Sequence, residues 1–430
     1  MTFIISFLIT SCTFKDNYKC KDCNVILISI DTLRADHLGV YGYTKNTTPN
    51  IDRFAKDSSV FLNTISQAPS TEPSHASIFT SLIPSKHGAL FSKKTKLSDE
   101  LVTFPKILKN KGYSTVSFHG GGQISSDYGF SQGFDIYEEI KEKNNNFEHN
   151  VKNATTWLQK NKNKKFFLFL HTFQVHLGYF LDHNYTYEFT KDYKGNLTEH
   201  TYINYINSVN ANKIKANKED TDYVISLYDS EIKSVDEAFN NLILFLKENN
   251  LYDNTIIIFT SDHGEEFGER HMIAYHSHTL YDELLKVPLI IKFPNSKYKN
   301  TITNKQVRSI DIFPTILDIL SIPITVDIDG VSLLNLLENK AFNITAISER
   351  DINMINLPAS LRTETWKLNI NSLYNIEDDP DEKIDLSKDY PEIVSVYKEL
   401  LDKEREENIT PTKTQISEDT YEKLKSLGYI

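Results

Sequence analysis

The sequence has little cysteine and places all of it near the amino terminus. Its 430 residues include three cysteines, Cys12, Cys20 and Cys23, so the chain after position 23 carries none. This distribution excludes a cysteine nucleophile, a zinc ribbon, an iron–sulfur cluster and a disulfide framework from the globular body. Cys20 and Cys23 could pair in an oxidising compartment, although a CxxC so close to a chain end is more often incidental.

Positive charge is also in short supply. Lys and Arg number 47 against 58 Asp and Glu, which gives a formal net charge of -11. Nucleic-acid binding needs a basic surface, so nucleic acid is excluded as a partner. With 40% hydrophobic and 24% charged residues, the chain has the composition of a soluble globular protein. Its length fits one large domain or two ordinary ones.

The apolar stretch that opens the chain, MTFIISFLITSC, is too short to cross a bilayer as a helix. It resembles a bacterial lipobox leader that ends at Cys12, the residue acylated in lipoproteins. We therefore expect a lipoprotein-type signal peptide over 1–11 and a solvated linker over 12–23. Acyl chains on Cys12 would anchor the protein in the bacterial cell envelope, facing the periplasm or the exterior. An apolar amino-terminal strand and a clipped secretory peptide are the alternatives.

From Asn24 onwards, apolar strand-like runs alternate with helical patterns. The run VILISI, Val25 to Ile30, is apolar almost throughout, as in a strand buried on both faces of a parallel sheet. Further strands are expected at 114–118, 166–171, 255–260 and 287–293, and helices at 73–82, 104–110, 154–160 and 222–249. This alternation predicts an α/β fold with a mostly parallel central sheet flanked by helices.

Two stretches interrupt the alternation. Residues 177–220 are polar and long for a connection, which favours a substrate-facing insertion or a mobile loop. After about Pro358 the pattern indicates a short antiparallel strand group over 366–374 and then a charged helical tail. The expected organisation is a catalytic domain over 24–357 and a small C-terminal α+β subdomain with the tail over 358–430.

Several chemically capable side chains directly follow predicted strands. Asp31 follows VILISI, His171 ends FFLFLH with His176 five residues on, and Asp262 and His263 follow TIIIFTS. Ligands of open α/β sheets bind beyond the carboxyl ends of the strands. Each residue alone could be a helix cap or a satisfied polar group near a turn. Together, two carboxylates and an imidazole at one sheet edge predict a divalent-metal site.

Five longer segments between Asn24 and about residue 393 follow one another in an order that is typical of one protein family. They are NVILISIDTLRADHLGVYGY, IIIFTSDHGEEFGE, HSHTLYDELLKVPLII, SIDIFPTILDIL and ETWKLNINSLYNIEDDPDEKIDLS. In this order they resemble the sulfatase family, a branch of the alkaline phosphatase superfamily. The resemblance implies an alkaline phosphatase-like fold and a metal-dependent ester hydrolase.

The sequence departs from that family at the nucleophile. Sulfatases carry CxPSR or SxPSR, whose Cys or Ser is oxidised to formylglycine, but the aligned segment here is TEPSH, residues 71–75. Threonine is not a precursor of that aldehyde. Thr71 would still present its hydroxyl at a helix N-terminus, where amide groups favour an anion. The resemblance therefore implies Thr71 as nucleophile, with a simple N-cap as the alternative, and His75 as a substrate-binding residue in place of the family's arginine.

The resemblance also implies the metal ligands Asp31, Thr71, Asp262 and His263. An Asp, Thr, Asp, His set looks more like the phosphoryl-transferring branch. Formylglycine sulfatases often have a second acidic residue at the position that Thr32 occupies here and an Asn at the position of His263. No DxxxH pair for a second ion occurs in the sequence. We therefore expect one divalent ion, with Ca²⁺, Mg²⁺, Mn²⁺ and Zn²⁺ all open, while the histidines His271, His276 and His278 leave a second ion as the alternative.

The family places histidines where they contact the anion or protonate the leaving group. His176 and His278 are the candidates, and His276 is the alternative to His278 and a candidate substrate-binding residue. Arg34 more simply pairs with a nearby carboxylate and stiffens its loop.

The sequence thus predicts a sulfatase-family hydrolase that cleaves a sulfate or phosphate ester through Thr71. Its substrate would be an anionic ester, such as an envelope glycan or lipid. The alternatives are a phosphodiesterase or phosphoethanolamine-type transferase of the envelope, and a non-catalytic binding lipoprotein. The clustered charges at Asp31, Asp262 and His263 argue against the last, because an idle site has no physical need for them.

Overall fold

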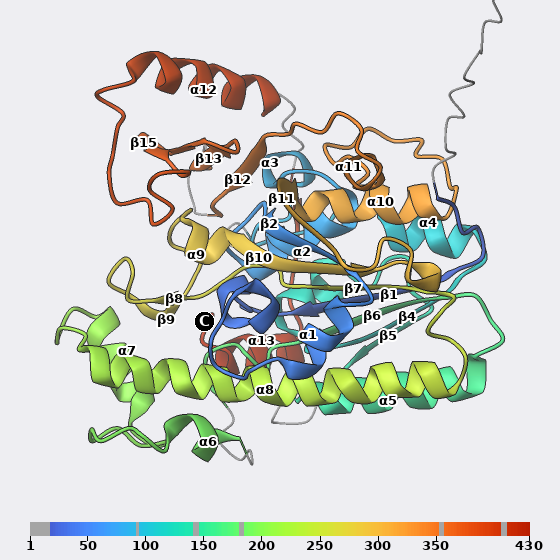
Figure 1. The fold of residues 1–430 in the computed structure, drawn as a ribbon, viewed down its shortest axis with the longest axis horizontal. Helices are drawn as coiled ribbons and strands as arrows, with labels where there is room; N and C mark the ends of the chain where they lie inside the picture. The colour runs from blue at the N-terminus through green and yellow to red at the C-terminus, as the bar shows by residue number, and fades with distance from the viewer. Residues whose placement is uncertain (1–17, 92–93, 141–145, 180–184, 352–356, 406–410) are drawn as a thin grey trace, which may run out of the picture.

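The computed structural model describes residues 18–91, 94–140, 146–179, 185–351, 357–405 and 411–430. An eight-stranded sheet in the order β11-β2-β10-β7-β1-β6-β4-β5 forms the centre, with helices on both faces (Figure 1). Within this sheet, β10 runs antiparallel to β2 and β7, and the other neighbouring strands pair in parallel. The predicted α/β fold with a mostly parallel sheet is confirmed.

The elements of this layered core lie close to the predicted ranges. Its strands are β1 (Asn24–Ile30), β2 (Ser59–Ile65), β4 (Ser114–His119), β5 (Ile136–Glu139), β6 (Phe166–Thr172), β7 (Thr255–Thr260), β10 (Lys286–Lys292) and β11 (Thr301–Arg308). Its main helices are α1 (Pro49–Ala55), α2 (Thr71–Thr80), α4 (Phe104–Asn110), α5 (Phe147–Asn161), α8 (Lys218–Glu248) and α10 (Ile312–Ile319).

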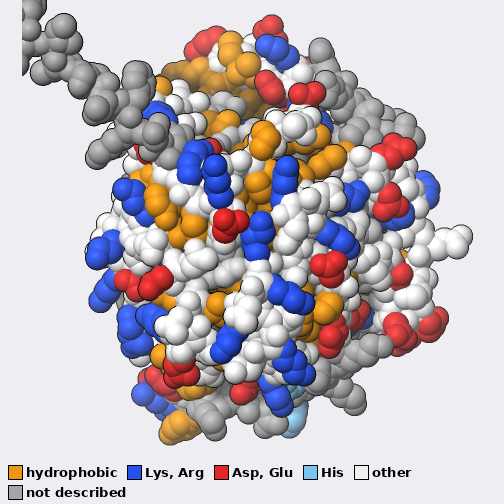
Figure 2. All heavy atoms as spheres, turned by 90° about the vertical axis from the view of Figure 1, so that its right-hand side faces the viewer, with side chains coloured by type: hydrophobic (Ala, Val, Ile, Leu, Met, Phe, Trp, Pro, Cys, Tyr) orange, Lys and Arg blue, Asp and Glu red, His pale blue; other side chains and the backbone are white. Residues whose placement is uncertain are grey.

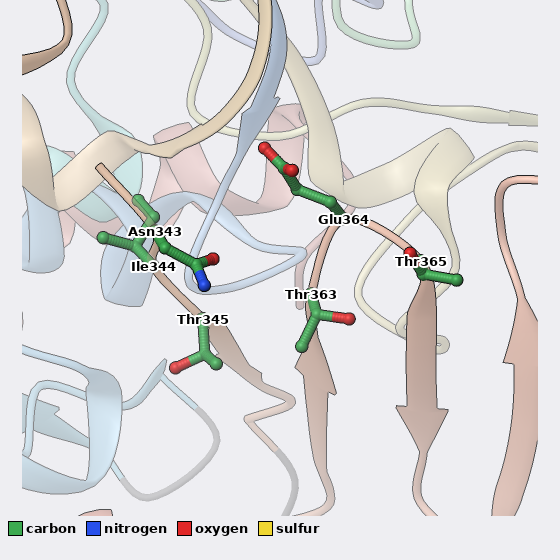
Figure 3. Close-up of a pocket in the computed structure, with 6 residues that line it drawn as sticks. All are labelled: Asn343, Ile344, Thr345, Thr363, Glu364 and Thr365. Carbon is green, nitrogen blue, oxygen red and sulfur yellow. The ribbon is translucent and has the colours of Figure 1, made fainter. Parts of the chain in front are cut away.

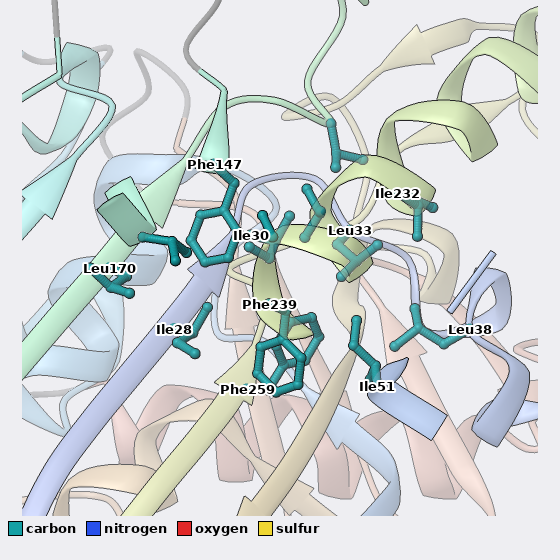
Figure 4. Close-up of a cluster of buried hydrophobic side chains, with 14 of the residues drawn as sticks. Ile28, Ile30, Leu33, Leu38, Ile51, Phe147, Leu170, Ile232, Phe239 and Phe259 are labelled. Atoms are coloured by element: carbon teal, nitrogen blue, oxygen red, sulfur yellow. The ribbon is translucent and has the colours of Figure 1, made fainter. Parts of the chain in front are cut away.

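Strand β1 is buried on both faces, as its continuous apolar run requires. Ile28 and Ile30 pack against Phe239 of α8 in one apolar cluster, which also holds residues of α1 and α5 (Figure 4). Val25 and Leu27 face a second cluster built with α2, α4 and α10. Because β1 is held on both sides, the residues that follow it start from a fixed position.

The described part of the predicted insertion is packed against the body. It forms α6 (Thr186–Thr190) and α7 (Tyr202–Asn210), and α7 buries Tyr202, Tyr205, Ile206 and Val209. The Asn210 side chain donates to Ile273 O at 3.0 Å and accepts from Ile273 N at 2.8 Å. The insertion therefore holds the small β8 (Glu266–Phe267) and β9 (Ile273–Tyr275) pair in place, and 180–184 lie outside the described residues.

A small antiparallel sheet forms the C-terminal subdomain, as predicted. Its strands are β12 (Ala346–Glu349), β13 (Ala359–Arg362), β14 (Trp366–Asn369) and β15 (Ser372–Asn375), with α12 (Pro391–Glu404) packed on them. The predicted boundary at 358 falls between β12 and β13, inside this sheet. Strand β12 is short and pairs with β13, so no local sequence pattern predicted it.

The end of the chain returns to the main body. Strand β16 (Thr412–Lys413) pairs with β3 (Thr95–Lys96), and α13 (Glu418–Ser426) follows. Figure 1 shows α13 below the central sheet and the C-terminus at the left-hand end of the sheet, beside β8 and β9. The tail that the sequence assigned to the C-terminal subdomain thus packs on the catalytic domain.

The described start of the chain is also fastened to the body. Cys20 and Cys23 form a disulfide, Cys23 is fully buried, and Cys20 N donates to Ile319 O at 2.7 Å. Residues 18–23 of the predicted linker are therefore attached to the body, although Lys19, Lys21 and Asp22 are exposed to solvent. Cys12 and the predicted signal peptide lie outside the described residues, and within the described parts no helix combines the length and apolar character that spanning a membrane requires.

Candidate active site at the carboxyl edge of the sheet

Two neighbouring strands bring the predicted metal ligands together. Asp31 directly follows β1, and Asp262 and His263 come just after β7, its neighbour in the sheet. All three side chains are fully buried, and one ligand atom from each lies within 4.8 Å of the others. Among the described residues, this is the one group of three acidic, His or Cys side chains with such spacing.

Thr71 lies against this group. It is the first residue of α2, and Ser70 holds the N-cap position with an extended backbone, so Thr71 is not the N-cap that the alternative reading required. The Thr71 hydroxyl donates to Asp31 Oδ2 at 3.2 Å and lies 3.4 Å from His263 Nε2. Its oxygen therefore lies beside the candidate ligands, at the start of a ten-residue helix whose first amides favour an anion.

His75 forms a hydrogen bond with the backbone of Thr71. Its Nδ1 donates to Thr71 O at 2.9 Å, and its Nε2 lies 3.0 Å from Ser29 Oγ. The imidazole is fully buried, and Nδ1 is 3.5 Å from Asp262 Oδ2. The sequence predicted His75 as a substrate-binding residue. In the structure both ring nitrogens are engaged, one by the backbone of Thr71 and the other by Ser29, so His75 contacts the first turn of α2.

The two carboxylates have the electrostatics of a metal site. Burial raises the pKa of Asp31, and the neighbouring Asp262 carboxylate raises it further. Burial opposes ionisation of Asp262 as well, but His263, His75 and His171 together lower its pKa. Asp31 Oδ1 and Asp262 Oδ2 are buried without a hydrogen-bond partner. Orphaned carboxylate oxygens beside an imidazole fit a divalent cation, which would satisfy both charges.

The predicted histidines separate into two environments. His276 Nδ1 is 2.9 Å from Glu265 Oε1, and the His276 ring centroid lies 4.6 Å from that of His263. His278 instead has its Nε2 2.7 Å from Glu266 Oε2, and among the described residues no hydrogen bond or ion pair joins it to Thr71 or the candidate ligands. Ser277 lies between them with a left-handed φ of 69°, and the two histidines face different carboxylates. His276 thus lies against His263, whereas His278 pairs with Glu266.

His176 faces the same site with a defined tautomer. Its Nδ1 lies 3.2 Å from Leu177 O, which can only accept, so Nδ1 carries the proton and Nε2 is free to accept one. Burial lowers the pKa of His176 to about 4, and His276 contributes to the shift. His176 is therefore neutral near pH 7, as a proton acceptor should be.

Comparison with known proteins agrees with this geometry. The Sulfatase family model matches residues 23–322, and the model of the N-sulphoglucosamine sulphohydrolase C-terminal region matches 268–419. The chain belongs to the sulfatase family. It is therefore an enzyme, a hydrolase with the alkaline phosphatase-like fold, as the sequence predicted.

Named relatives of this sulfatase-family chain are distant but extensive. The ulvan-active sulfatase of Formosa agariphila is 28% identical, and the match covers 78% of this chain and 70% of that protein. The Δ4,5-hexuronate-2-O-sulfatase of Bacteroides thetaiotaomicron is 24% identical over 88% of each chain.

Among solved structures, the phosphonate monoester hydrolase of Agrobacterium radiobacter superposes with a TM-score of 0.74 at 18% identity, covering 92% of this chain and all of that one. A structure described as bound to its substrate D-glucosamine-2-N,6-O-disulfate gives 0.72 at 21% identity, covering 90% and 99%. At these identities the structures support the fold alone.

Three further residues of this sulfatase-family site were not among the predicted site residues. His171, which ends the predicted β6 run, is fully buried with Nε2 3.5 Å from Asp31 Oδ2. Glu265 is fully buried beside His276, and burial raises its pKa to about 7. The sequence singled out His171 by its position at a strand end but gave it no role. Nothing local signals the third, Tyr429, which reaches Thr71 across 358 positions of sequence.

The loop after β1 is braced as the sequence suggested. Arg34 pairs with Asp36 and Glu269, each at 2.7 Å. Thr32 has a left-handed φ of 57°, which is strained for a β-branched residue, and its amide donates to Asp262 Oδ1 at 3.3 Å. The strain is offset by this bond, which ties the β1 loop to the β7 loop.

Away from this cluster, one hollow among the described residues lacks its chemistry. A hollow of about 420 Å³ beside the small sheet is lined by Asn343, Ile344, Thr345, Thr363, Glu364 and Thr365 (Figure 3). It contains a single charged group and no residue of the buried cluster. On the face at the right of Figure 1, basic and acidic side chains are interspersed and histidine is scarce (Figure 2). The sheet edge therefore remains the candidate active site.

Proposed function

We propose that this sulfatase-family enzyme hydrolyses a sulfate ester, with Thr71 as nucleophile in place of the formylglycine precursor. One observation carries the proposal. The Thr71 hydroxyl, at the N-terminus of α2, lies 3.2 Å from Asp31 Oδ2 and 3.4 Å from His263 Nε2, within the buried ligand cluster. Asp31, Asp262, His263 and Thr71 are the residues that would hold one divalent ion.

The chain's own residues set up the attack. A divalent cation held there supplies Lewis acidity, which lowers the pKa of a neighbouring hydroxyl and screens anionic substrate oxygens. Thr71 Oγ forms a bond to the sulfur as the bond from sulfur to the ester oxygen breaks. The amides of the first turn of α2 stabilise the developing negative charge.

In this mechanism His176 transfers the protons. His176 Nε2, which faces the site without a proton, accepts the proton of the nucleophile and returns it to the departing oxygen. A threonine sulfate has no route of collapse to an aldehyde. Water must therefore attack the sulfur as the bond from sulfur to Thr71 Oγ breaks, and His176 Nε2 takes a proton from that water and returns it to Thr71 Oγ as sulfate leaves.

The substrate class we propose is a sulfated carbohydrate. The names of the relatives support it, since they include enzymes acting on ulvan, on a hexuronate 2-O-sulfate and on N-acetylglucosamine 6-O-sulfate. The net charge of -11 means that the local metal and histidines, rather than the whole protein, would draw in the anion.

Phosphate esters form a second candidate class, favoured by one observation. The ligand set has an imidazole, His263, and the nucleophile is an unmodified hydroxyl whose ester must be resolved by water, as phosphoryl-transfer chemistry allows. The phosphodiesterase and phosphoethanolamine-transferase alternatives belong to this class.

A substrate panel decides between these classes. The purified enzyme is assayed on nitrophenyl sulfate, nitrophenyl phosphate and a nitrophenyl phosphodiester with Ca²⁺, Mg²⁺, Mn²⁺ and Zn²⁺ in turn. We expect one bound divalent ion per chain by elemental analysis and the highest kcat/KM on the sulfate. A protein that binds no metal, or one that is faster on either phosphate, would contradict the proposal.

The leader sequence indicates where the enzyme acts. We infer a lipid anchor on Cys12 from the leader sequence, in the cell envelope. Labelling with a fatty-acid analogue in a bacterial host should mark the wild-type chain and leave Cys12→Ser unlabelled. Equal labelling of the two would refute the anchor.

A further inference from the structure

The last twenty residues are firmly attached to the catalytic domain. Asp127 accepts hydrogen bonds from Ser417 N at 2.7 Å, Ser417 Oγ at 2.7 Å and Thr420 Oγ1 at 2.6 Å. Leu424 is fully buried in the apolar cluster shared with α2. Together with the pairing of β16 and β3, these contacts hold the start of α13 against the body.

The end of α13 turns the chain toward the active site. Gly428 has a φ of +80°, and its amide donates to Lys425 O at 3.1 Å, while Tyr429 N donates to Leu424 O at 3.0 Å. These two bonds form a Schellman motif, which needs a left-handed residue and therefore suits glycine. The motif fixes the direction in which the next side chain, Tyr429, leaves the helix.

Tyr429 places its hydroxyl inside the site. The oxygen lies 3.1 Å from Thr71 Oγ1, 3.1 Å from His176 Nε2 and 3.4 Å from His276 Nε2. Its ring also contacts Phe91, with the centroids 5.8 Å apart. The phenol therefore bridges the candidate nucleophile and both histidines that face it.

A substrate needs the same space. A nucleophilic oxygen must approach the reacting atom to within about 3 to 3.5 Å. The other side-chain neighbours of Thr71 Oγ1 are Asp31 and His263, which belong to the ligand cluster. The Tyr429 hydroxyl occupies the space between Thr71 Oγ1 and His176 Nε2, in contact with both.

We propose that residues 411–430 are a closing tail, and that Tyr429 occupies the place of the substrate's anionic group. The site then takes its substrate only after Tyr429 has moved away. This inference rests on the proposed function in one respect, namely that the anion binds beside Thr71. Docking of the tail lowers the apparent affinity for any anion by the fraction of molecules in which the site is open.

Inorganic sulfate is the probe, so that the test does not depend on turnover. Sulfate is titrated calorimetrically into the full chain as purified and into Tyr429→Ala, Tyr429→Phe and Tyr421→Ala. Tyr421 lies on α13, just before Tyr429 in the chain, and is 42% exposed, which makes it a matched control. We expect sulfate to bind Tyr429→Ala about tenfold more tightly than the wild type, Tyr429→Phe to lie between them, and Tyr421→Ala to be unchanged.

A second measurement uses the wild-type chain alone. Added sulfate should speed amide hydrogen exchange in 418–430, because it competes with Tyr429, and leave exchange in the α12 segment unchanged. Equal or weaker sulfate binding by Tyr429→Ala, exchange in 418–430 that sulfate leaves unchanged or slows, or no sulfate binding by any variant would overturn the closing tail. Failure of the proposed function would appear separately, as absence of nitrophenyl sulfate turnover.

Discussion

The two sides of the site are built in different ways. On one side, Asp31, Asp262 and Thr71 extend from the central sheet and α2, and all are fully buried. On the other side, His176 and Tyr429 come from a loop and from the chain's end. In the function we propose, the sheet side would hold the metal ion and the nucleophile, whereas the loop and the tail would supply proton transfer and control access.

The largest effect should come from breaking the sheet side. In Asp262→Asn, loss of one anionic ligand removes the cation and the charge stabilisation that it supplies, which we expect to lower kcat/KM by at least about 10⁴. Elemental analysis should find the metal gone. The surface substitution Asp402→Asn is the control, and a variant that kept metal and activity would exclude Asp262 as a ligand.

A smaller effect is expected on the histidine side. Replacing His176 by Gln removes the proton acceptor but no ligand, so kcat should fall about a hundredfold while the metal content stays at the wild-type level. His200→Ala, which changes an exposed histidine, serves as control. If His176→Gln lost its metal, the division between the two sides would be wrong.

His276 and His278 sharpen the same division. We expect His276→Ala to reduce kcat/KM about tenfold or more, because its ring borders His263 and His176. His278→Ala should change it by less than about threefold, since His278 faces Glu266. The reverse order, measured on nitrophenyl sulfate, would restore His278 as the site residue.

The sequence allowed much of the sheet side to be predicted. Asp31, Asp262 and His263 each follow a strand whose apolar run is local, and parallel strands bring their ends to one edge. His276 and His278 could not be separated, because their difference depends on the left-handed turn at Ser277.

Tyr429 lay beyond sequence reasoning altogether. A charged amphipathic tail predicts a helix, but nothing in it names the surface on which that helix packs. The contact between Tyr429 and Thr71 forms only when Asp127 and the apolar cluster around Leu424 hold α13 in place. The residues that do so come from distant parts of the chain.

The smallest predicted effect is on stability and concerns His87, whose ring contacts the backbone of α2. Burial lowers the pKa of His87 to about 3, and its Nε2 lies 3.1 Å from Pro73 O. The unfolded chain therefore binds more protons between pH 6.5 and 3, so His87 favours folding fully above pH 6.5 and less as the pH falls. His87 contributes at most about 1.4 kcal/mol per pH unit to the change of the free energy of unfolding with pH.

Urea unfolding of the wild type and His87→Asn between pH 7.5 and 5 measures this share. The wild type should lose stability more steeply with acidification than the variant. Parallel curves would show that His87 is not held neutral.

The account depends most on Thr71. The direct measurement is nitrophenyl sulfate turnover by Thr71→Ala and Thr71→Ser, each with its metal content determined. We predict that Thr71→Ala folds but turns over at the rate of the buffer, and that Thr71→Ser, which keeps a hydroxyl at the start of α2, retains activity. Turnover by Thr71→Ala at the wild-type rate would contradict the assignment of Thr71 as the nucleophile.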